Sequence, residues 1–379
     1  MTRPPFGRYT PALVVLFLAT FPLSAQTPSP TLPGPSASPQ ADGVAPASLI
    51  EPMSDAPPAT AQPAAAPALP PIDSFGGGRG MGLGAGAATP RFSYRSTWLP
   101  EEPVAGQAAH LGYVEQDLSL STPIWHEGGD VWSTSLNVRS ELFQTDAFLP
   151  TTGDRFPPEL WDVRLGTAYQ HLFDNGWVGG ANLSVGSASD RPFAAFKDMT
   201  VGASASLRVP QGERNAWIFS LNYSTNSQVL SNIPIPGVAY FYNPNDWFQA
   251  TIGFPFANMT YRATDDLTLQ FSYALLTNIH TKAIYRLGPM VRLYGGFDWS
   301  NESYLRADRV NDQDRFQYNY KQIGGGVQVL LSRNADLDFS SGYDFDRFYY
   351  EGKGVGSEHN NRVDVGDGPY IGAKLSIRY

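Results

Sequence analysis

The side chains best suited to chemistry in this chain are charged residues that recur at every second position of short segments, which places them on one face of a strand. Rows of opposite charge across a lumen can orient and select polar solutes. The same rows can instead pair with each other and fill a narrow barrel. By strand phase, the inward-facing candidates are Lys282, Arg286, Arg292, Arg262, Asp298, Asp338, Asp344 and Asp346.

Three of these candidates, Lys282, Arg286 and Arg292, come from adjacent segments, so a basic patch is expected there. The histidines show no spacing that would bind a metal ion, because no two lie at i, i+2 on a strand or i, i+4 on a helix. His280 shares the polar face of its segment with Lys282 and is expected to be solvated. The sequence therefore predicts neither a metal site nor a cofactor.

Hydrolase chemistry is not expected either, since it needs Ser, His and a carboxylate that converge on one face. His171 and Ser184 lie in neighbouring segments, but strand phase puts them on opposite faces. The chain has no cysteine, which excludes thiolate nucleophiles, thiolate metal sites and disulfides. An outer-membrane hydrolase is the least favoured function, and the protein is not expected to be an enzyme.

The elements that must position the charged side chains are β-strands. From Arg91 onward apolar and polar residues alternate, as in 266–276, where Leu267 and Leu269 alternate with Thr268 and Gln270. Only 16% of the residues are charged and 13% are aromatic. This composition is typical of strands that face lipid on one side and a polar lumen on the other.

Two patterns favour a closed membrane barrel over a soluble sandwich, which also has one apolar face per strand. Short turns alternate with long polar loops, the expected asymmetry of an outer-membrane barrel. Tryptophans lie near predicted strand ends on the apolar face, as in an interfacial aromatic belt. The long loops are 144–159, 188–197, 302–315 and 351–368, and the tryptophans are Trp132, Trp161, Trp177, Trp217 and Trp299.

The chain ends in a strand whose apolar face carries Leu375, Ile377 and Tyr379, with Lys374 and Arg378 on the other face. A final amphipathic strand closed by a C-terminal aromatic resembles the signal that hands bacterial outer-membrane barrels to their assembly machinery. The barrel-assembly machinery is therefore an expected partner.

The N-terminal part is predicted to be a targeting signal followed by a tether. Residues 1–25 combine Arg3 and Arg8 with an apolar run and a small-residue cleavage site, which predicts a secretory signal peptide. Residues 26–90 are rich in Pro, Ala and Ser and then in Gly, which predicts a disordered periplasmic tether. Whether its Gly-rich part, 76–86, hangs below a barrel or enters it as a plug stays open.

One segment resembles a family of bacterial outer-membrane β-barrels known only as a domain of unknown function. The similarity is expected to extend over about residues 90–379. It implies location and architecture, and it carries no catalytic or binding residues. The resembling residues are Pro236-Gly237-Val238-Ala239-Tyr240, Asn243-Pro244, Gly253-Phe254-Pro255 and Tyr261-Arg262.

We therefore expect residues 91–379 to form one all-β, antiparallel outer-membrane β-barrel of roughly 12–16 strands. The count should be even because both ends belong on the periplasmic side; the stretch 247–263 is long for one spanning strand and short for two. The expected function is a pore or transporter for small polar solutes in the outer membrane, in contact with its lipid. The alternative is a structural or surface-interaction barrel with a filled lumen. A net charge of -9 argues against a nucleic-acid partner.

Overall fold

The computed structural model describes residues 89–379, except for 228–229, 275–277 and 355–356. The predicted signal peptide and nearly all of the predicted tether lie outside the described residues. Within the described residues the protein is all-β apart from one 3-10 turn, η1 (Phe196–Asp198). None of the helical segments described there is long and apolar enough to cross a membrane.

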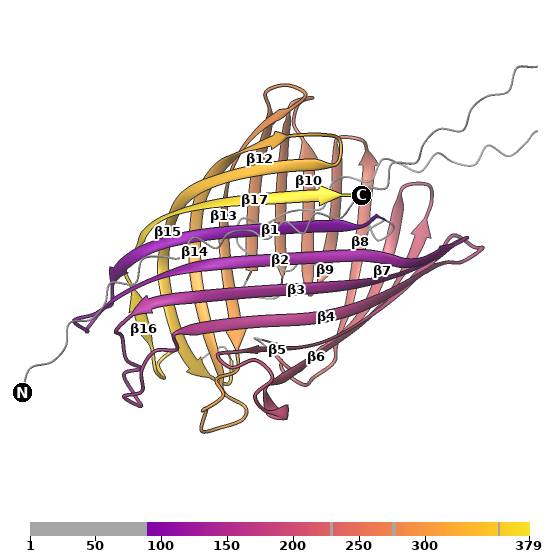
Figure 1. Ribbon diagram of the computed structural model, residues 1–379. Helices are drawn as coiled ribbons and strands as arrows, with labels where there is room; N and C mark the ends of the chain where they lie inside the picture. Colours follow the sequence, from indigo (N-terminus) through magenta and orange to yellow (C-terminus); the bar gives the residue numbers. More distant parts are fainter. Residues whose placement is uncertain (1–88, 228–229, 275–277, 355–356) are drawn as a thin grey trace, which may run out of the picture. The chain divides into compact units, whose positions relative to one another are not determined.

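The strands are long and follow one another with few interruptions (Figure 1). They are β1 (Arg91–Pro103), β2 (His110–Glu127), β3 (Asp130–Thr145), β4 (Glu159–Leu172), β5 (Val178–Ser189), β6 (Met199–Gln211), β7 (Asn215–Ser224), β8 (Ile235–Asn245), β9 (Phe248–Phe254), β10 (Phe256–Arg262), β11 (Leu267–Ala274), β12 (Asn278–Arg286), β13 (Val291–Tyr304), β14 (Arg315–Leu330), β15 (Ala335–Gly352), β16 (Val363–Val365) and β17 (Gly368–Arg378).

The sheet closes on itself because β17 pairs with β1, next to it in Figure 1. Every neighbouring pair is antiparallel, and β15 pairs directly with β17, so β16 is a short addition on β15. The barrel wall therefore has 16 strands, which confirms the predicted fold class. The ambiguous stretch 247–263 forms two short strands, β9 and β10, that pair with each other.

The strand register separates an inner face from an outer face, because residues paired across two antiparallel strands share a face. One inner row runs through Lys374, Arg95, Asp117, Arg139 and Asp162 on successive strands. The opposite face carries exposed apolar side chains, among them Leu165, Leu183 and Phe219 at 56%, 50% and 45% exposure. Polar-in and apolar-out is thus the arrangement that the alternation predicts.

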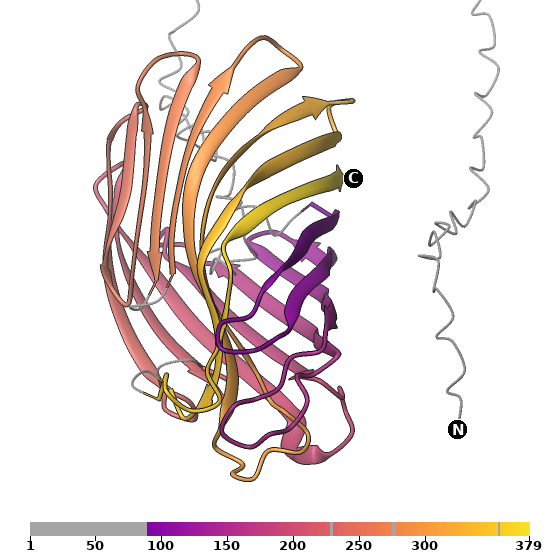
Figure 2. The same cartoon turned by 90° about the vertical axis from the view of Figure 1, so that its left-hand side faces the viewer.

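The two ends of the barrel differ in their connections. At one end, called the turn end, the strands are joined by short links such as 128–129, 212–214 and 331–334. At the other, called the loop end, lie the longer connections 146–158, 190–198, 305–314 and 353–367, gathered at the bottom of Figure 2. The first residue of β1 and the last of β17 pair with each other at the turn end.

Five exposed tryptophans lie at the turn end. Trp125, Trp132 and Trp217 belong to β2, β3 and β7, and the other two lie in the turns. Their exposure is 39–47%, although the indole is a large apolar group. Of the predicted belt, Trp132, Trp177 and Trp217 belong to this set, whereas Trp161 lies near the other end of β4 and Trp299 in the middle of β13. The full set is Trp125, Trp132, Trp177, Trp217 and Trp247.

Candidate functional site

The inner face of the barrel is the candidate site, and its character changes around the wall. The central inward positions of β5, β6 and β7 carry small polar side chains, and none of these central residues is buried. Nearer the strand ends the inner face holds the buried residues Ala188, Thr200, Ala216 and Ile218 and the larger Arg208. Asn182 is exposed although its register turns it inward, so solvent reaches this part of the lumen. The residues are Asn182, Ser184, Ser204, Ser206, Ser220 and Asn222.

Three of the predicted lumen arginines lie at the turn end of their strands. Arg262 is the last residue of β10, Arg286 is the last of β12, and Arg292 is the second of β13. Arg286 and Arg292 are direct cross-strand partners. The Arg286 Nε atom lies 3.0 Å from Asp266 Oδ1, in an ion pair that is half exposed. These arginines are therefore accessible to solvent at the mouth of the barrel.

Lys282 does not join Arg286 and Arg292 in one patch. Its Nζ atom lies 4.0 Å from the ring centroid of Tyr294, over the face of the ring. The Tyr294 hydroxyl in turn donates a hydrogen bond of 2.5 Å to Asp338. Lys282 and Asp338 thus contact opposite parts of the same tyrosine, which joins β12, β13 and β15 on the inner face.

Asp298 and Asp344 lie deeper, each 1% exposed. Asp298 Oδ1 is 2.6 Å from His280 Nδ1, and Asp344 Oδ1 accepts a hydrogen bond of 2.8 Å from Gln322. The expectation that His280 is solvated is wrong: the residue is 8% exposed, because Asp298 on the neighbouring strand pairs with it inside the wall.

Asp346 does not face the lumen, which corrects the prediction from strand phase. The pairing of β14 with β15 shifts register between Asn319 and Lys321, and Asp346 adopts a φ of +50° at this bulge. The extra residue turns Asp346 outward, where it is 61% exposed and pairs with Lys321 Nζ at 2.6 Å. Beyond the bulge the inward position passes to Arg347, which is 2% exposed.

We expect the Lys321–Asp346 pair to contribute little to stability, because both side chains reach solvent and exposed ion pairs are worth about 0–1 kcal/mol. Asp346→Asn should therefore change the free energy of unfolding by less than about 1 kcal/mol. Urea titration of the folded barrel measures this, with Lys321→Gln as the matched variant. A loss of several kcal/mol would place Asp346 in the buried network instead.

Sequence reasoning missed an aromatic cluster at the loop end. Tyr113, Phe143, Phe156, Tyr318 and Tyr349 come from β2, β3, the loop 146–158, β14 and β15, and pack on the inner face. Tyr318 and Tyr349 stack with ring centroids 4.2 Å apart, and the Tyr113 and Tyr318 hydroxyls lie 3.2 Å apart. Alternation marks each as a strand residue but gives no sign that they meet.

An ion-pair network continues from the aromatic cluster. Arg139, 5% exposed, places Nη1 at 2.5 Å from Glu302, Nη2 at 3.0 Å from Asp117 and Nε at 3.9 Å from Glu115. The Tyr304 hydroxyl lies 2.7 Å from Glu141 and 2.8 Å from Glu302. These bonds connect β2 and β3 to β13 through the interior.

Three acids of this network could offer oxygens to a cation. The carboxylates of Glu115, Glu141 and Glu302 each place an oxygen within 4.8 Å of the others. The Arg139 guanidinium already lies against two of the three, so it supplies the positive charge that an ion would supply. The group therefore reads as part of an internal ion-pair network.

Opposite walls of the barrel touch at the loop end. The Leu305 amide donates a hydrogen bond of 2.7 Å to the Ala188 carbonyl, which connects the end of β13 to the end of β5. Arg309, in the loop 305–314, is 1% exposed at its side chain and lies 2.5 Å from Asp198. Arg315 Nη2 donates to the Thr225 carbonyl at 3.0 Å. The lumen is narrowed there by the chain itself.

Arg306 belongs to the same loop and remains charged. Burial lowers the pKa of its guanidinium, but the carboxylates of Glu351 and Asp308 raise it more, so the pKa lies above its usual value. The ion pairs to Glu351 and Asp308 measure 3.1 and 2.9 Å. This charge network holds the loop 305–314 against the end of β15.

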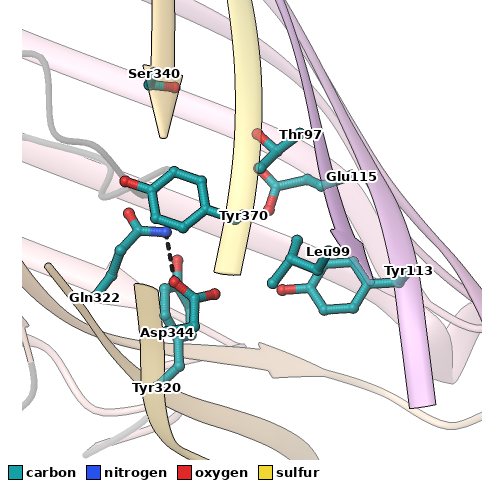
Figure 3. A pocket seen from close by; sticks show the side chains of 9 residues that line it. All are labelled: Thr97, Leu99, Tyr113, Glu115, Tyr320, Gln322, Ser340, Asp344 and Tyr370. Carbon is teal, nitrogen blue, oxygen red and sulfur yellow. Dashed lines mark hydrogen bonds between the residues drawn. The ribbon is translucent and has the colours of Figure 1, made fainter. Parts of the chain in front are cut away.

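A small cavity is lined by Tyr113 of the aromatic cluster and by neighbouring polar side chains (Figure 3). Its walls include Thr97, Glu115, Tyr370 and the hydrogen-bonded pair Gln322 and Asp344. Its volume of ≈ 20 Å³ holds about one water molecule. This part of the interior is therefore filled by side chains, whereas the wall of β5–β7 is not.

The residues of the predicted assembly signal lie on the outer face of the last strand. Leu375 and Ile377 pair with Tyr94 and Phe92 of β1. Tyr379 follows the strand and is 70% exposed. The side chains are thus accessible from outside the barrel.

Comparison with known proteins leaves the family open: no family model matches the chain, and no curated protein does. Among solved structures, an outer-membrane channel from Pseudomonas putida F1 is similar at 10% identity and a TM-score of 0.33, covering 77% of this chain and 96% of that one. The toluene transporter TodX from Pseudomonas putida is similar at 9% and 0.35, covering 76% and 89%. The translocator domain of the autotransporter NalP from Neisseria meningitidis is similar at 9% and 0.29, covering 79% and 91%. Such low scores transfer neither a topology nor an activity.

Proposed function

We propose that this chain is an outer-membrane β-barrel that passes small polar solutes along the β5–β7 side of its lumen. The observation that carries the proposal is the row of small, incompletely buried polar side chains on that wall, from Asn182 to Asn222. Short Ser and Asn side chains leave room in a lumen that large residues would fill. Their hydroxyl and amide groups can hydrogen-bond a passing solute.

The outer face supports the membrane location. Its exposed apolar side chains would be costly in water but suit hydrocarbon, and tryptophans such as Trp132 and Trp217 suit the membrane–water interface. A closed sheet leaves no unpaired edge in lipid, where every backbone group needs a partner. The exposed Tyr379 and the outward Ile377 support our further proposal that the assembly machinery reads the last strand.

Conductance across a planar bilayer tests the transport proposal. We expect Ser220→Trp to lower the single-channel conductance by roughly half or more, because an indole on the inner face of β7 obstructs the lumen. The matched control is Phe219→Trp on the same strand, since Phe219 is 45% exposed on the outer face and should accept an indole. Equal conductance of the two variants would contradict a solute path along this wall.

A second candidate is a structural barrel without transport, and the aromatic cluster favours it. On the inner face of the barrel, the exposed fraction of Tyr349 is 0% and that of Tyr318 is 1%. This sector of the lumen is therefore a packed core. If the folded, heat-resistant wild-type barrel never conducts, the structural role replaces the transport role.

A further inference from the structure

Two pairs of arginines oppose each other directly across neighbouring strands. Arg286 on β12 pairs in register with Arg292 on β13, and Arg91 on β1 pairs with Arg378 on β17. Like charges directly opposite each other destabilise a sheet. Both pairs belong to the inner face, because they continue the rows of Lys282 and Lys374 at intervals of two residues.

All four arginines lie at the turn end, and two more inward arginines join them. Each is within three residues of the turn end of its strand. Six strands thus present a guanidinium toward the same mouth of the lumen. The set, called the turn-end arginines, is Arg91, Arg208, Arg262, Arg286, Arg292 and Arg378.

On the inward strand positions near this end, the only acids among the described residues are Asp336 and Asp338, which do not balance the six turn-end arginines. Arg286 pairs with Asp266 at 3.0 Å and Arg378 with Asp336 at 3.3 Å, and both arginine side chains are about half exposed. The other four form no ion pair with any residue that the structure describes. The excess of positive charge belongs to the inward strand positions alone, since the turns at the same end carry acids of their own, namely Asp174, Glu213, Asp246, Asp265 and Asp266.

We infer that the turn end of the lumen binds anionic solutes that carry a phosphate or carboxylate, and that the cross-strand pair Arg286 and Arg292 holds them. A guanidinium presents a planar fork of donors that matches the oxygens of either group. An anion placed between Arg286 and Arg292 would offset their mutual repulsion. The inference rests on the proposed transport function and names its substrate class.

Binding of inorganic phosphate to the full-length folded barrel, measured by isothermal titration calorimetry in detergent, tests the inference without any conduction. We expect the double variant Arg286→Gln and Arg292→Gln to weaken binding by about tenfold or more, since charge-assisted bonds are lost. Arg292→Lys keeps the charge and loses the fork, so it should fall between wild type and the double variant. Arg333→Gln, a turn residue at the same end, is the matched control.

The same variants in a planar bilayer under a salt gradient report selectivity. The wild-type reversal potential should indicate preference for chloride over potassium, and the double variant should reduce that preference. Unaltered phosphate binding in the folded double variant would overturn the inference. Conduction without anion preference and without phosphate binding would also overturn the anion site, but it would agree with the proposed channel. Phosphate binding without conduction would contradict only the transport function.

A lipid headgroup carries the same phosphate chemistry as a free anion. Repeating the phosphate titration in nanodiscs of phosphatidylglycerol and in nanodiscs of phosphatidylcholine distinguishes a solute site from a lipid-headgroup site. Equal phosphate affinity in both lipids supports a solute site. Loss of phosphate binding in phosphatidylglycerol would overturn the solute site in favour of a lipid headgroup.

Discussion

Arg139→Met is expected to lower the free energy of unfolding by about 3–5 kcal/mol, the cost of leaving buried charges without their partner. Arg139 is 5% exposed and lies within 3.0 Å of Asp117 and 2.5 Å of Glu302. Methionine replaces the aliphatic stem of arginine but has no group that can donate to a carboxylate. The acids would then face one another inside the wall, where like charges repel strongly at low dielectric.

Urea titration of the barrel folded in lipid vesicles, read by the gel shift of heat-resistant barrels, measures this loss. Arg214→Met in the turn 212–214 is the control: the side chains of Arg214 and its partner Asp246 are 48% and 78% exposed, so losing this 2.8 Å pair should cost no more than about 1 kcal/mol. Equal losses from both variants would show that the Arg139 network is solvated. Adding Glu302→Gln to Arg139→Met should recover part of the lost stability, because it removes one of the carboxylates that the single variant leaves without a partner.

Leu183→Arg is expected to prevent folding into lipid, whereas Asn182→Arg on the same strand should be tolerated. Leu183 is 50% exposed on the outer face near the middle of β5, and Asn182 is its inward neighbour. An arginine that faces hydrocarbon at the bilayer midplane costs about 2–4 kcal/mol. On the lumen side the same group stays in contact with water.

The measurement is the fraction of protein that reaches the heat-resistant form in phospholipid vesicles. Leu183→Ala serves as the size control, because it shortens the side chain without adding a charge. Folding of both arginine variants to the same extent would mean that β5 does not have one face in lipid, and the outer-membrane location would lose its support.

Much of the fold was predictable because its information is local. A period of two assigns every residue of a regular strand to one face, since a slip of one position would turn the apolar set into the lumen. The alternation around Leu269, the short turns and the amphipathic last strand from Tyr370 onward therefore predicted a closed antiparallel barrel. The same periodicity placed Arg262, Arg286 and Arg292 on the strand face that the register turns inward.

Strand phase failed where the strand is irregular. The bulge at Asp346 inserts one residue with a positive φ, and from there the phase of β15 is reversed. Aspartate occurs both in regular strands and in turns, so an aspartate in the sequence does not predict a bulge. The inward position passed to Arg347, which no periodic pattern had marked.

The sequence by itself determined the class of the fold, its closure and which strand face is apolar, because these follow from alternation along neighbouring residues. Only the tertiary structure decided how the lumen is filled. Tyr113 meets Tyr318 across 205 residues of chain, and Arg139 meets Glu302 across 163. Such contacts depend on the curvature and register of the whole closed sheet, which no local window of sequence encodes.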